Sequence, residues 1–384
     1  MDFSLTTEQK LLRDSVREFA QKEIAPSLAE REEKGEFSYE IWKKMSELYL
    51  TGLCIPTEYG GGGADALTTV IGMEAFALGS RDMSLMIVWG SHLLLCGMAI
   101  VGMGTEEQKK MYLPKMASGE WMGAYGLTEP EAGSDATGLK TTAEKKDDYY
   151  ILNGSKTYIS NAPIADVFVV FASTDLSKKA EGISLFIVEK DSPGLTRGEP
   201  LKKYDLHAAP TGELFFDDCM VPAKNMLGGE GMGFQAMLTS LGWERIAFAP
   251  TIGFMEADLN VCIKYAKERK QFGRPIGSYQ LVQAMLAEMK MDLEASRYLG
   301  YYVAWKKDRN ELTALDAAVA KTFITEAAER SSQKAVQIFG GYGCMRESLI
   351  GRSLWMAKMG TIGGGTSQIQ RLILGRILTG LSSK

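Results

Sequence analysis

Hydrophobic patterning along the chain changes character twice, and these changes restrict the fold more than any single motif. From about residue 7 to residue 122, apolar side chains recur at the three- and four-residue spacing of amphipathic helices, with breaks at Pro26, Pro56 and residues 60–63. Short β-branched and aromatic runs follow, separated by turn residues, at 149–152, 167–171, 183–188 and 213–216. Helical spacing returns from residue 233. This order predicts a mainly α protein with a central β-domain.

The 384 residues are expected to form three domains. We predict an N-terminal helical domain over 1–121, a middle β-domain over 122–230 and a C-terminal helical bundle over 231–384. Pro250 falls inside the first helical stretch of the bundle, so we expect a kink or a helix boundary there.

Charge and hydropathy exclude several classes of protein. The 43 Lys and Arg residues and 48 Asp and Glu residues leave a net charge of −5, which argues against a nucleic-acid-binding protein. The first ten residues lack the basic and apolar regions of a signal peptide. Since the sequence shows no unbroken apolar run of about 18 residues, we expect no membrane span. A cytoplasmic location is predicted.

Cysteine and histidine usage narrows the chemistry further. The five cysteines are odd in number and never spaced as CxxC, which indicates neither a disulfide framework nor a zinc site. His92 and His207 are the only imidazoles, so a His-rich metal centre is excluded. No metal site is predicted, and proton chemistry is expected to rest on carboxylates or a cofactor.

Five motifs lie at the seams between the predicted domains. They read AYGLTEPEAGSD at 124–135, NGSKTYISN at 153–161, ERKQFG at 268–273, QIFGGYG at 337–343 and GTSQIQR at 365–371. In this order they resemble the acyl-CoA dehydrogenase family of FAD flavoproteins, and the resemblance covers about residues 7 to 380. It implies a helical domain, a middle β-barrel-like domain and a C-terminal four-helix bundle.

Small and hydroxyl-bearing residues in these motifs suit a flavin site. Backbone amides, hydroxyls and a carboxamide can hold a pyrophosphate and a ribityl chain without a cationic cage, and small residues let the backbone approach closely. The resemblance implies that Tyr158 and Ser160 contact the isoalloxazine edge near N5. It also implies flavin or phosphate contacts by Tyr125, Leu127, Thr128, Gly133, Ser134, Thr366 and Gln368.

Four further residues would reach the FAD of a neighbouring subunit in this family, namely Arg269, Phe272, Gln337 and Gly341. The resemblance therefore implies a homotetramer built as a dimer of dimers. The residues alone also fit a structural interpretation, in which Gly273 caps a helix end and Gly340–Gly341 forms a turn between helices.

The family's reaction needs one carboxylate beside the α-carbon of a thioester, while the β-hydride passes to flavin N5. Many members place a Glu directly before the Gly-Thr of the last motif, but this chain has Gly364 there. Isovaleryl-CoA and long-chain acyl-CoA dehydrogenases place a Glu before an Arg on the first bundle helix, and Glu244 matches that position. Burial among its apolar neighbours would raise its pKa toward the working pH. A solvated Glu244–Arg245 pair on a helix face is the alternative.

The resemblance also implies an oxyanion site. The backbone N–H of Gly364 and the ribityl 2′-hydroxyl of FAD would bind the thioester carbonyl and stabilise enolate-like charge. Gly242 stands where many members carry an Asp that helps to hold the pantetheine arm, which puts the usual CoA contacts in doubt.

Bulky residues before the β-domain suggest a compact acyl pocket. Trp89, His92 and Leu95 occupy positions expected to face it. Together with Glu244, these features resemble most closely the prolyl-carrier-protein dehydrogenases and oxidases of anatoxin- and pyrrole-type biosynthesis. A cationic His92 near the flavin would stabilise negative charge, including that of reduced O2, although an ordinary core histidine fits equally. His207 is assigned no role.

Three functions stay open at this point. The first is oxidation of L-prolyl-S-acyl carrier protein to a pyrroline or pyrrole thioester. The second is a short branched-chain acyl-CoA dehydrogenase of the isovaleryl type, with electron-transfer flavoprotein as acceptor, and the third is a non-catalytic flavin-binding scaffold. The sequence does not identify the carrier protein, the number of oxidation steps, or whether O2 is the acceptor.

Overall fold

The structure, a computed structural model, describes residues 4–246 and 248–381, with the side chains of 238–241, 244 and 245 excepted. Among the described residues, the first part is formed mainly by seven α-helices and two π-helical segments, of which η1 (Ala20–Ile24) follows the first helix directly. The other segments are α1 (Thr7–Phe19), α2 (Leu28–Lys34), α3 (Tyr39–Glu47), α4 (Ala66–Ser80), α5 (Met83–Gly90), the π-helix η4 (Ser91–Gly97), α6 (Met98–Met103) and α7 (Glu106–Ala117). Helix α4 is buried on nearly every side and packs against α1.

The segment Met83–Met103 corrects the expectation that no stretch of the chain is long and apolar enough to span a membrane. Its 21 residues are apolar enough, by length and composition, to cross a membrane, with a mean hydropathy of 1.9. In the fold, however, 72% of the apolar window is buried inside the protein, where α5, η4 and α6 form the centre of the helical core. Burial against neighbouring helices and the β-domain accounts for this composition.

The four predicted strands are confirmed within one mixed sheet. Its members are β1 (Gly123–Gly126), β2 (Thr142–Lys146), β3 (Tyr149–Ser160), β4 (Val167–Ser173), β5 (Ile183–Glu189), β6 (Leu195–Arg197), β7 (Thr211–Pro222) and β8 (Met226–Leu227). The order is β6-β7-β3-β2-β4-β5-β8, and β1 pairs in parallel with β4. Strands β4 and β5 are buried nearly throughout, as continuous apolar runs predict.

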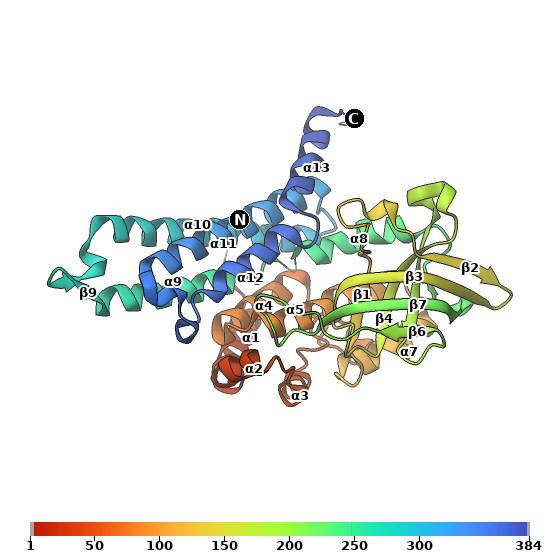
Figure 1. The fold of residues 1–384 in the computed structure, drawn as a ribbon, viewed down its shortest axis with the longest axis horizontal. Coiled ribbons are helices and arrows are strands. Elements are labelled where there is room, and N and C mark those ends of the chain that lie inside the picture. The colour runs from red at the N-terminus through yellow and green to blue at the C-terminus, as the bar shows by residue number, and fades with distance from the viewer. Residues whose placement is uncertain (1–3, 247, 382–384) are drawn as a thin grey trace.

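The C-terminal part is a bundle of long helices that extends away from the sheet (Figure 1). It contains α8 (Gly233–Ile246), α9 (Thr251–Glu268), α10 (Gln280–Asp308), α11 (Ala314–Phe339), α12 (Arg352–Ile362) and α13 (Ser367–Thr379). A hairpin of β9 (Lys270–Gln271) and β10 (Arg274–Pro275) lies at the far end of the bundle (Figure 1). Pro250 precedes the first residue of α9, which confirms the predicted boundary.

Candidate active site

Strand β1 is held in place by side chains from the helical core and from the end of β3. The Asn161 side-chain amide donates to the carbonyl oxygens of Val88 and Gly123, at 3.0 and 2.9 Å. The N–H of Gly123 donates to Nδ1 of His92 at 3.0 Å. Both polar groups of Gly123 are therefore bonded to buried side chains. This anchoring orients Tyr125 and the residues that follow, where the sequence predicts flavin contacts.

The loop after β1 is built around a buried ion pair. Lys156 Nζ lies 2.6 Å from Glu129 Oε1 and also donates to the Leu127 carbonyl at 3.2 Å. Glu129 accepts the backbone N–H groups of Lys140 and Thr141 at 2.6 and 3.0 Å. Burial opposes ionisation of Glu129, but Lys156 and these donors outweigh it and hold its pKa below the usual value. Both residues lie within the motifs, yet residue type alone indicated no role for them.

The residues of the β-domain that the sequence predicts to contact the flavin are exposed or half-buried. Tyr158 has a positive φ of 57° and its side chain is 72% exposed, although it lies within β3. Tyr125, Leu127, Thr128 and Ser160 are half-buried. A Cβ added to Gly133 would meet no atom within 4 Å. Since an exposed aromatic ring stands beside small and hydroxyl-bearing residues, the donor set fits a planar ring with a phosphate tail.

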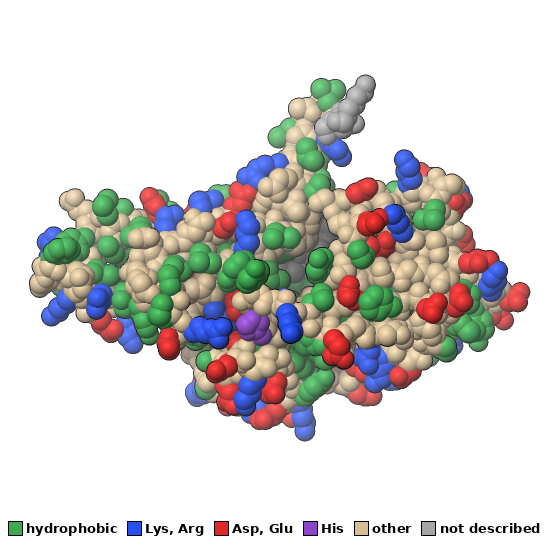
Figure 2. Space-filling model, in the orientation of Figure 1, with side chains coloured by type: hydrophobic (Ala, Val, Ile, Leu, Met, Phe, Trp, Pro, Cys, Tyr) green, Lys and Arg blue, Asp and Glu red, His purple; other side chains and the backbone are tan. Residues whose placement is uncertain are grey.

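Residues 363–365 form a glycine loop between α12 and α13, within hydrogen-bonding reach of α11. Gly364 and Gly365 have φ values of 63° and 81°, in the left-handed region that favours glycine. The hydroxyl of Thr366 caps α13 by accepting the N–H of Ile369 at 3.2 Å. Gln368 is exposed on α13. On the face drawn in Figure 2, the surface is hollowed between the base of α13 and the β-domain.

The chain after α8 also reaches the glycine loop. An added Cβ on Gly363 would lie 3.8 Å from the ring carbon Cζ of Phe248. Phe248 follows Glu244 by four residues. The helical backbone is described at Glu244, but the predicted base's side chain lies outside the described residues. The chain just after α8 and the loop that contains residue 364 are therefore neighbours.

His92 does not have the charged form that the sequence hypothesis required. Its side chain is fully buried in η4, Nδ1 accepts the Gly123 N–H, and Nε2 lies 3.2 Å from the Thr51 carbonyl oxygen. Burial lowers its pKa from 6.5 to about 4. A ring that accepts at Nδ1 and donates at Nε2 is neutral. The hypothesis of a cationic imidazole is therefore wrong, and His92 joins the helical core to β1.

The pocket-facing orientation expected for Trp89 and His92 is also wrong. Trp89 is fully buried, donates from Nε1 to the Leu50 carbonyl at 2.7 Å and packs against Phe76. Neither ring faces an open channel, so neither limits the size of an acyl group directly. Leu95 is half-buried. The sequence placed these residues before the β-domain but did not specify which side of their helices the core would cover.

His92 makes stability depend on pH. The unfolded chain binds a proton near pH 6.5 and the folded chain only near pH 4, so stability should fall as pH decreases through this window. The loss attributable to this group is expected to reach about 3 kcal/mol. Urea unfolding at several pH values will measure it. His92→Gln keeps one acceptor and one donor without titrating, and should flatten this dependence. His207→Gln is the control. If the free energy of unfolding of His92→Gln depends on pH as it does in the wild type, His92 is not the group responsible.

The four residues expected to reach a neighbouring FAD lie apart from this site. Arg269 and Gly341 line one hollow at the far end of the bundle, together with Phe339 and Tyr342. Gln337 is exposed close by on α11, and Phe272 is 94% exposed on the hairpin. Figure 1 shows this hairpin at the opposite end of the molecule from β1 and β3. Within one chain the two sets do not converge.

Comparison with protein families accounts for nearly the whole chain. The N-terminal domain of acyl-CoA dehydrogenase matches residues 6–120, its middle domain matches 124–219 and its C-terminal domain matches 231–379. The L-prolyl-[peptidyl-carrier protein] dehydrogenase of Pseudomonas fluorescens is 43% identical, over 98% of this chain and 100% of that protein. Mitochondrial isovaleryl-CoA dehydrogenase of Oryza sativa is 40% identical, over 96% and 91% of the two chains.

Solved structures agree with these matches. The crystal structure of the prolyl acyl carrier protein oxidase AnaB has a TM-score of 0.96 at 39% identity, covering 98% of this chain and all of the other. A structure described as PigA with FAD and proline has a TM-score of 0.96 at 34% identity and covers 99% of both chains. Likeness at this level extends over all three parts of the fold.

Proposed function

Because this chain belongs to the acyl-CoA dehydrogenase family, we propose that it oxidises the prolyl group of an L-prolyl thioester carried on an acyl carrier protein. The protein is an FAD-dependent oxidoreductase of that family. Its likeness to a prolyl-carrier-protein dehydrogenase and to a prolyl carrier protein oxidase supports the substrate class. The product would be a pyrroline or pyrrole thioester.

One structural observation carries the proposed chemistry. Residue 364 is a glycine, and Phe248 places the chain after α8 beside the glycine loop. A carboxylate on the last turns of α8 could therefore serve the same reacting atoms as one at position 364. Glu244 is the residue proposed to take the α-proton. Together with the family resemblance, this convergence supports relocation of the base rather than its loss.

The remaining steps follow from groups of this chain. The N–H of Gly364 is proposed to donate to the thioester carbonyl, which lowers the energy of the enolate-like charge formed as Glu244 takes the proton. Tyr158 and Ser160 border the site of the flavin ring, while Lys156 and Glu129 hold the loop of Leu127 and Thr128 against it. Bound FAD supplies the hydride acceptor.

Assembly is part of the proposal because the hairpin that carries Phe272 lies at the opposite end of the molecule from β1 and β3 (Figure 1). We propose that Arg269, Phe272, Gln337 and Gly341 complete the cofactor site of a second copy, within a homotetramer. Tyr125, Leu127, Thr128, Gly133, Ser134, Thr366 and Gln368 are proposed contacts within the same copy. The exposed ring of Phe272 at the tip of the hairpin supports a surface that is covered on assembly.

A second function is supported by a specific similarity. Isovaleryl-CoA dehydrogenase is nearly as similar as the prolyl-carrier-protein enzyme, at 40% against 43% identity. In this alternative the substrate is a short branched acyl-CoA and the acceptor is electron-transfer flavoprotein. A chain in a structure described as an electron transferring flavoprotein of Acidaminococcus fermentans has 42% identity to this chain and a TM-score of 0.95.

Anaerobic flavin bleaching separates these functions. The purified yellow protein is mixed in one series with L-prolyl-S-carrier protein and in another with isovaleryl-CoA, and absorbance of the oxidised flavin is followed. We expect the prolyl thioester to bleach the flavin at least about tenfold faster, since a pocket suited to one substrate rejects the other by 1–3 kcal/mol or more. Bleaching by isovaleryl-CoA alone would contradict the proposed substrate. Bleaching by neither would favour a scaffold.

Admission of oxygen after bleaching identifies the class of acceptor. Rapid return of the oxidised spectrum in air would indicate an oxidase, and slow return that is accelerated by electron-transfer flavoprotein would indicate a dehydrogenase. Because His92 is neutral and bonded on both sides, it offers no positive charge to favour reaction with O2.

A further inference from the structure

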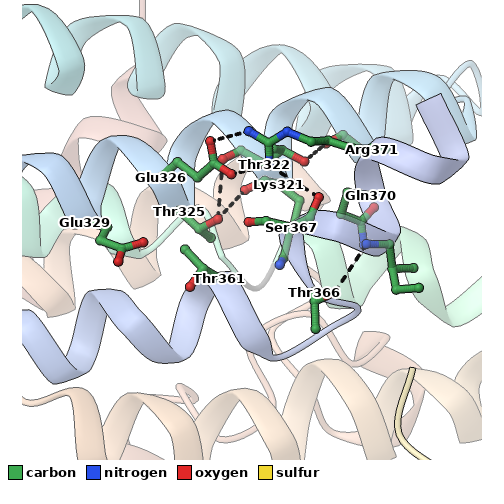
Figure 3. Close-up of polar contacts among 12 residues, drawn as sticks. Lys321, Thr322, Thr325, Glu326, Glu329, Thr361, Thr366, Ser367, Gln370 and Arg371 are labelled. Atoms are coloured by element: carbon green, nitrogen blue, oxygen red, sulfur yellow. Dashed lines mark hydrogen bonds and ion pairs between the residues drawn. The ribbon is translucent and has the colours of Figure 1, made fainter. Parts of the chain in front are cut away.

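Two buried side chains hydrogen-bond to backbone carbonyls of the glycine loop. Lys321 on α11 donates from Nζ to the Gly365 carbonyl at 2.8 Å. Gln370 on α13 donates from Nε2 to the carbonyls of Gly364 and Gly365, at 3.0 and 3.2 Å. Lys321 and Gln370 are 0% and 1% exposed. Figure 3 shows Lys321 reaching from α11 toward the start of α13, the helix that carries Gln370 itself.

The hydrogen-bond partners of Gln370 determine which way its side-chain amide is oriented. Both groups near Gln370 Nε2 are carbonyl oxygens, which only accept, so the amide NH2 must face the loop. Gln370 Oε1 is buried and makes no hydrogen bond among the described residues. An added Cβ on Gly365 would lie 2.7 Å from Gln370 Nε2. The close approach of the amide to the loop therefore requires glycine at position 365.

Lys321 is a long polar side chain that is fully buried. A polar group in the protein interior costs free energy unless it is hydrogen-bonded, and the Gly365 carbonyl accepts one hydrogen bond from this amine. Its Nζ also lies 5.1 Å from the ring centre of Phe248, beside Gly363. Lys321 thus contacts both the glycine loop and the chain after α8, the two segments that the proposed chemistry brings together.

Three consecutive glycines need such hydrogen bonds to keep one backbone conformation. Glycine loses more conformational freedom on folding than any other residue, and residues 363–365 have no side chains to hold them. Helix α12 holds Gly363 through its N–H to the Met359 carbonyl at 2.8 Å. The Gly364 N–H belongs to the next peptide unit, 363–364. That unit lies between the one held by Met359 and the 364–365 unit, whose carbonyl Gln370 binds.

From these contacts we infer that Lys321 and Gln370 are positioning residues that orient the Gly364 N–H toward the thioester carbonyl. The inference rests on the proposed thioester oxidation but not on the identity of the acyl group. Neither residue touches the reacting atoms. Each acts through a backbone carbonyl, so that the oxyanion donor is oriented before substrate binds and needs no reorganisation during reaction.

The test compares Lys321→Met and Gln370→Met with the wild-type holoenzyme. Each variant removes donors and approximately preserves side-chain length. Lys358→Met is the matched control, because Lys358 lies on neighbouring α12 and pairs with Glu329 at 3.0 Å with a half-exposed side chain. Anaerobic flavin reduction is followed over a range of thioester concentrations, with whichever of the two thioesters bleaches the wild type. Misassignment of the acyl group therefore leaves the test intact.

Both positioning variants are expected to lower the limiting rate of flavin reduction by about tenfold to a hundredfold, as small misplacements of catalytic groups do. The thioester concentration at half-maximal rate should change by less than about threefold, since ground-state binding uses other contacts. An α-deuterated thioester should show a larger isotope effect than in the wild type, because removal of the α-proton becomes more rate-limiting. The control should behave as the wild type does.

Hydrogen exchange gives a readout independent of activity. Amides of the peptide spanning residues 360–368 should exchange faster in both positioning variants, with FAD bound and with the rest of α11 unchanged. Wild-type limiting rates in both variants would overturn the inference. So would a rate loss that follows FAD loss while exchange at the loop stays at the wild-type level, because that result indicates structural support only. If Lys321→Met does not fold, Gln370→Met, which replaces a neutral side chain, tests the inference by itself.

Discussion

Replacing Glu244 with Gln is expected to slow flavin reduction by substrate by about a hundredfold to ten-thousandfold, the range that a positioned general base contributes. Gln has nearly the same size but cannot take a proton, so the FAD and the fold should be retained. Stopped-flow absorbance under anaerobic conditions measures the rate, and the yellow colour of the purified variant reports bound FAD. Glu288→Gln, at a half-exposed glutamate on α10, is the matched control.

The glycine at position 364 offers a second check on the same assignment. Adding Gly364→Glu to the Glu244→Gln variant moves the carboxylate to the family's more common position. Partial recovery of flavin reduction is expected, limited by the left-handed φ of 63°, which costs a non-glycine residue about 1–2 kcal/mol. Undiminished activity of Glu244→Gln alone would remove Glu244 from the mechanism and leave the α-proton to another base.

Lys156→Met is expected to destabilise the protein by about 3–5 kcal/mol and to release FAD. The variant would leave Glu129 ionised without its counter-charge in a site where its side chain is 6% exposed. The Leu127 carbonyl would lose a donor as well, so the flavin-facing loop should loosen. Thermal unfolding measures the stability, and flavin absorbance after gel filtration measures the retained FAD.

Two comparisons separate loss of the buried pair from loss of a positive charge. Lys140→Met removes an exposed partner of Glu131, and a pair of that kind contributes only about 0–1 kcal/mol. Adding Glu129→Gln to Lys156→Met removes the uncompensated charge, so part of the lost stability should return. A wild-type melting temperature in Lys156→Met would show that the loop does not depend on this ion pair.

Local patterns were sufficient for the secondary structure and the family. The strands predicted at 149–152, 167–171, 183–188 and 213–216 are present, and the helix boundary at Pro250 is confirmed. Hydrophobic period and proline geometry act within a few residues, so they can be read directly along the chain. The motifs likewise predicted the acyl-CoA dehydrogenase fold, which the family models confirm.

Side-chain orientation could not be predicted in the same way. Trp89 and His92 were expected to face a pocket, but their ring nitrogens bond the backbone of residues 50 and 51. Those partners lie about forty residues away in the chain. A helix that is apolar on several sides, as α5 is, carries no signal for which side will be covered. The orientation of these two side chains was decided only by packing against the connection between α3 and α4.

The residue types needed for thioester oxidation, including a glutamate before Arg245 and a glycine at 364, are properties of the sequence and follow from its motifs. Three features could be seen only in the folded chain. They are the charge state of His92, the burial of the Lys156–Glu129 pair and the hydrogen bond from Lys321 to Gly365. Each depends on partners brought together from 27 to 44 residues apart, where burial strengthens a hydrogen bond and penalises an unpaired charge. Hydrophobic pattern determines which elements form, and long-range packing determines the electrostatics between them.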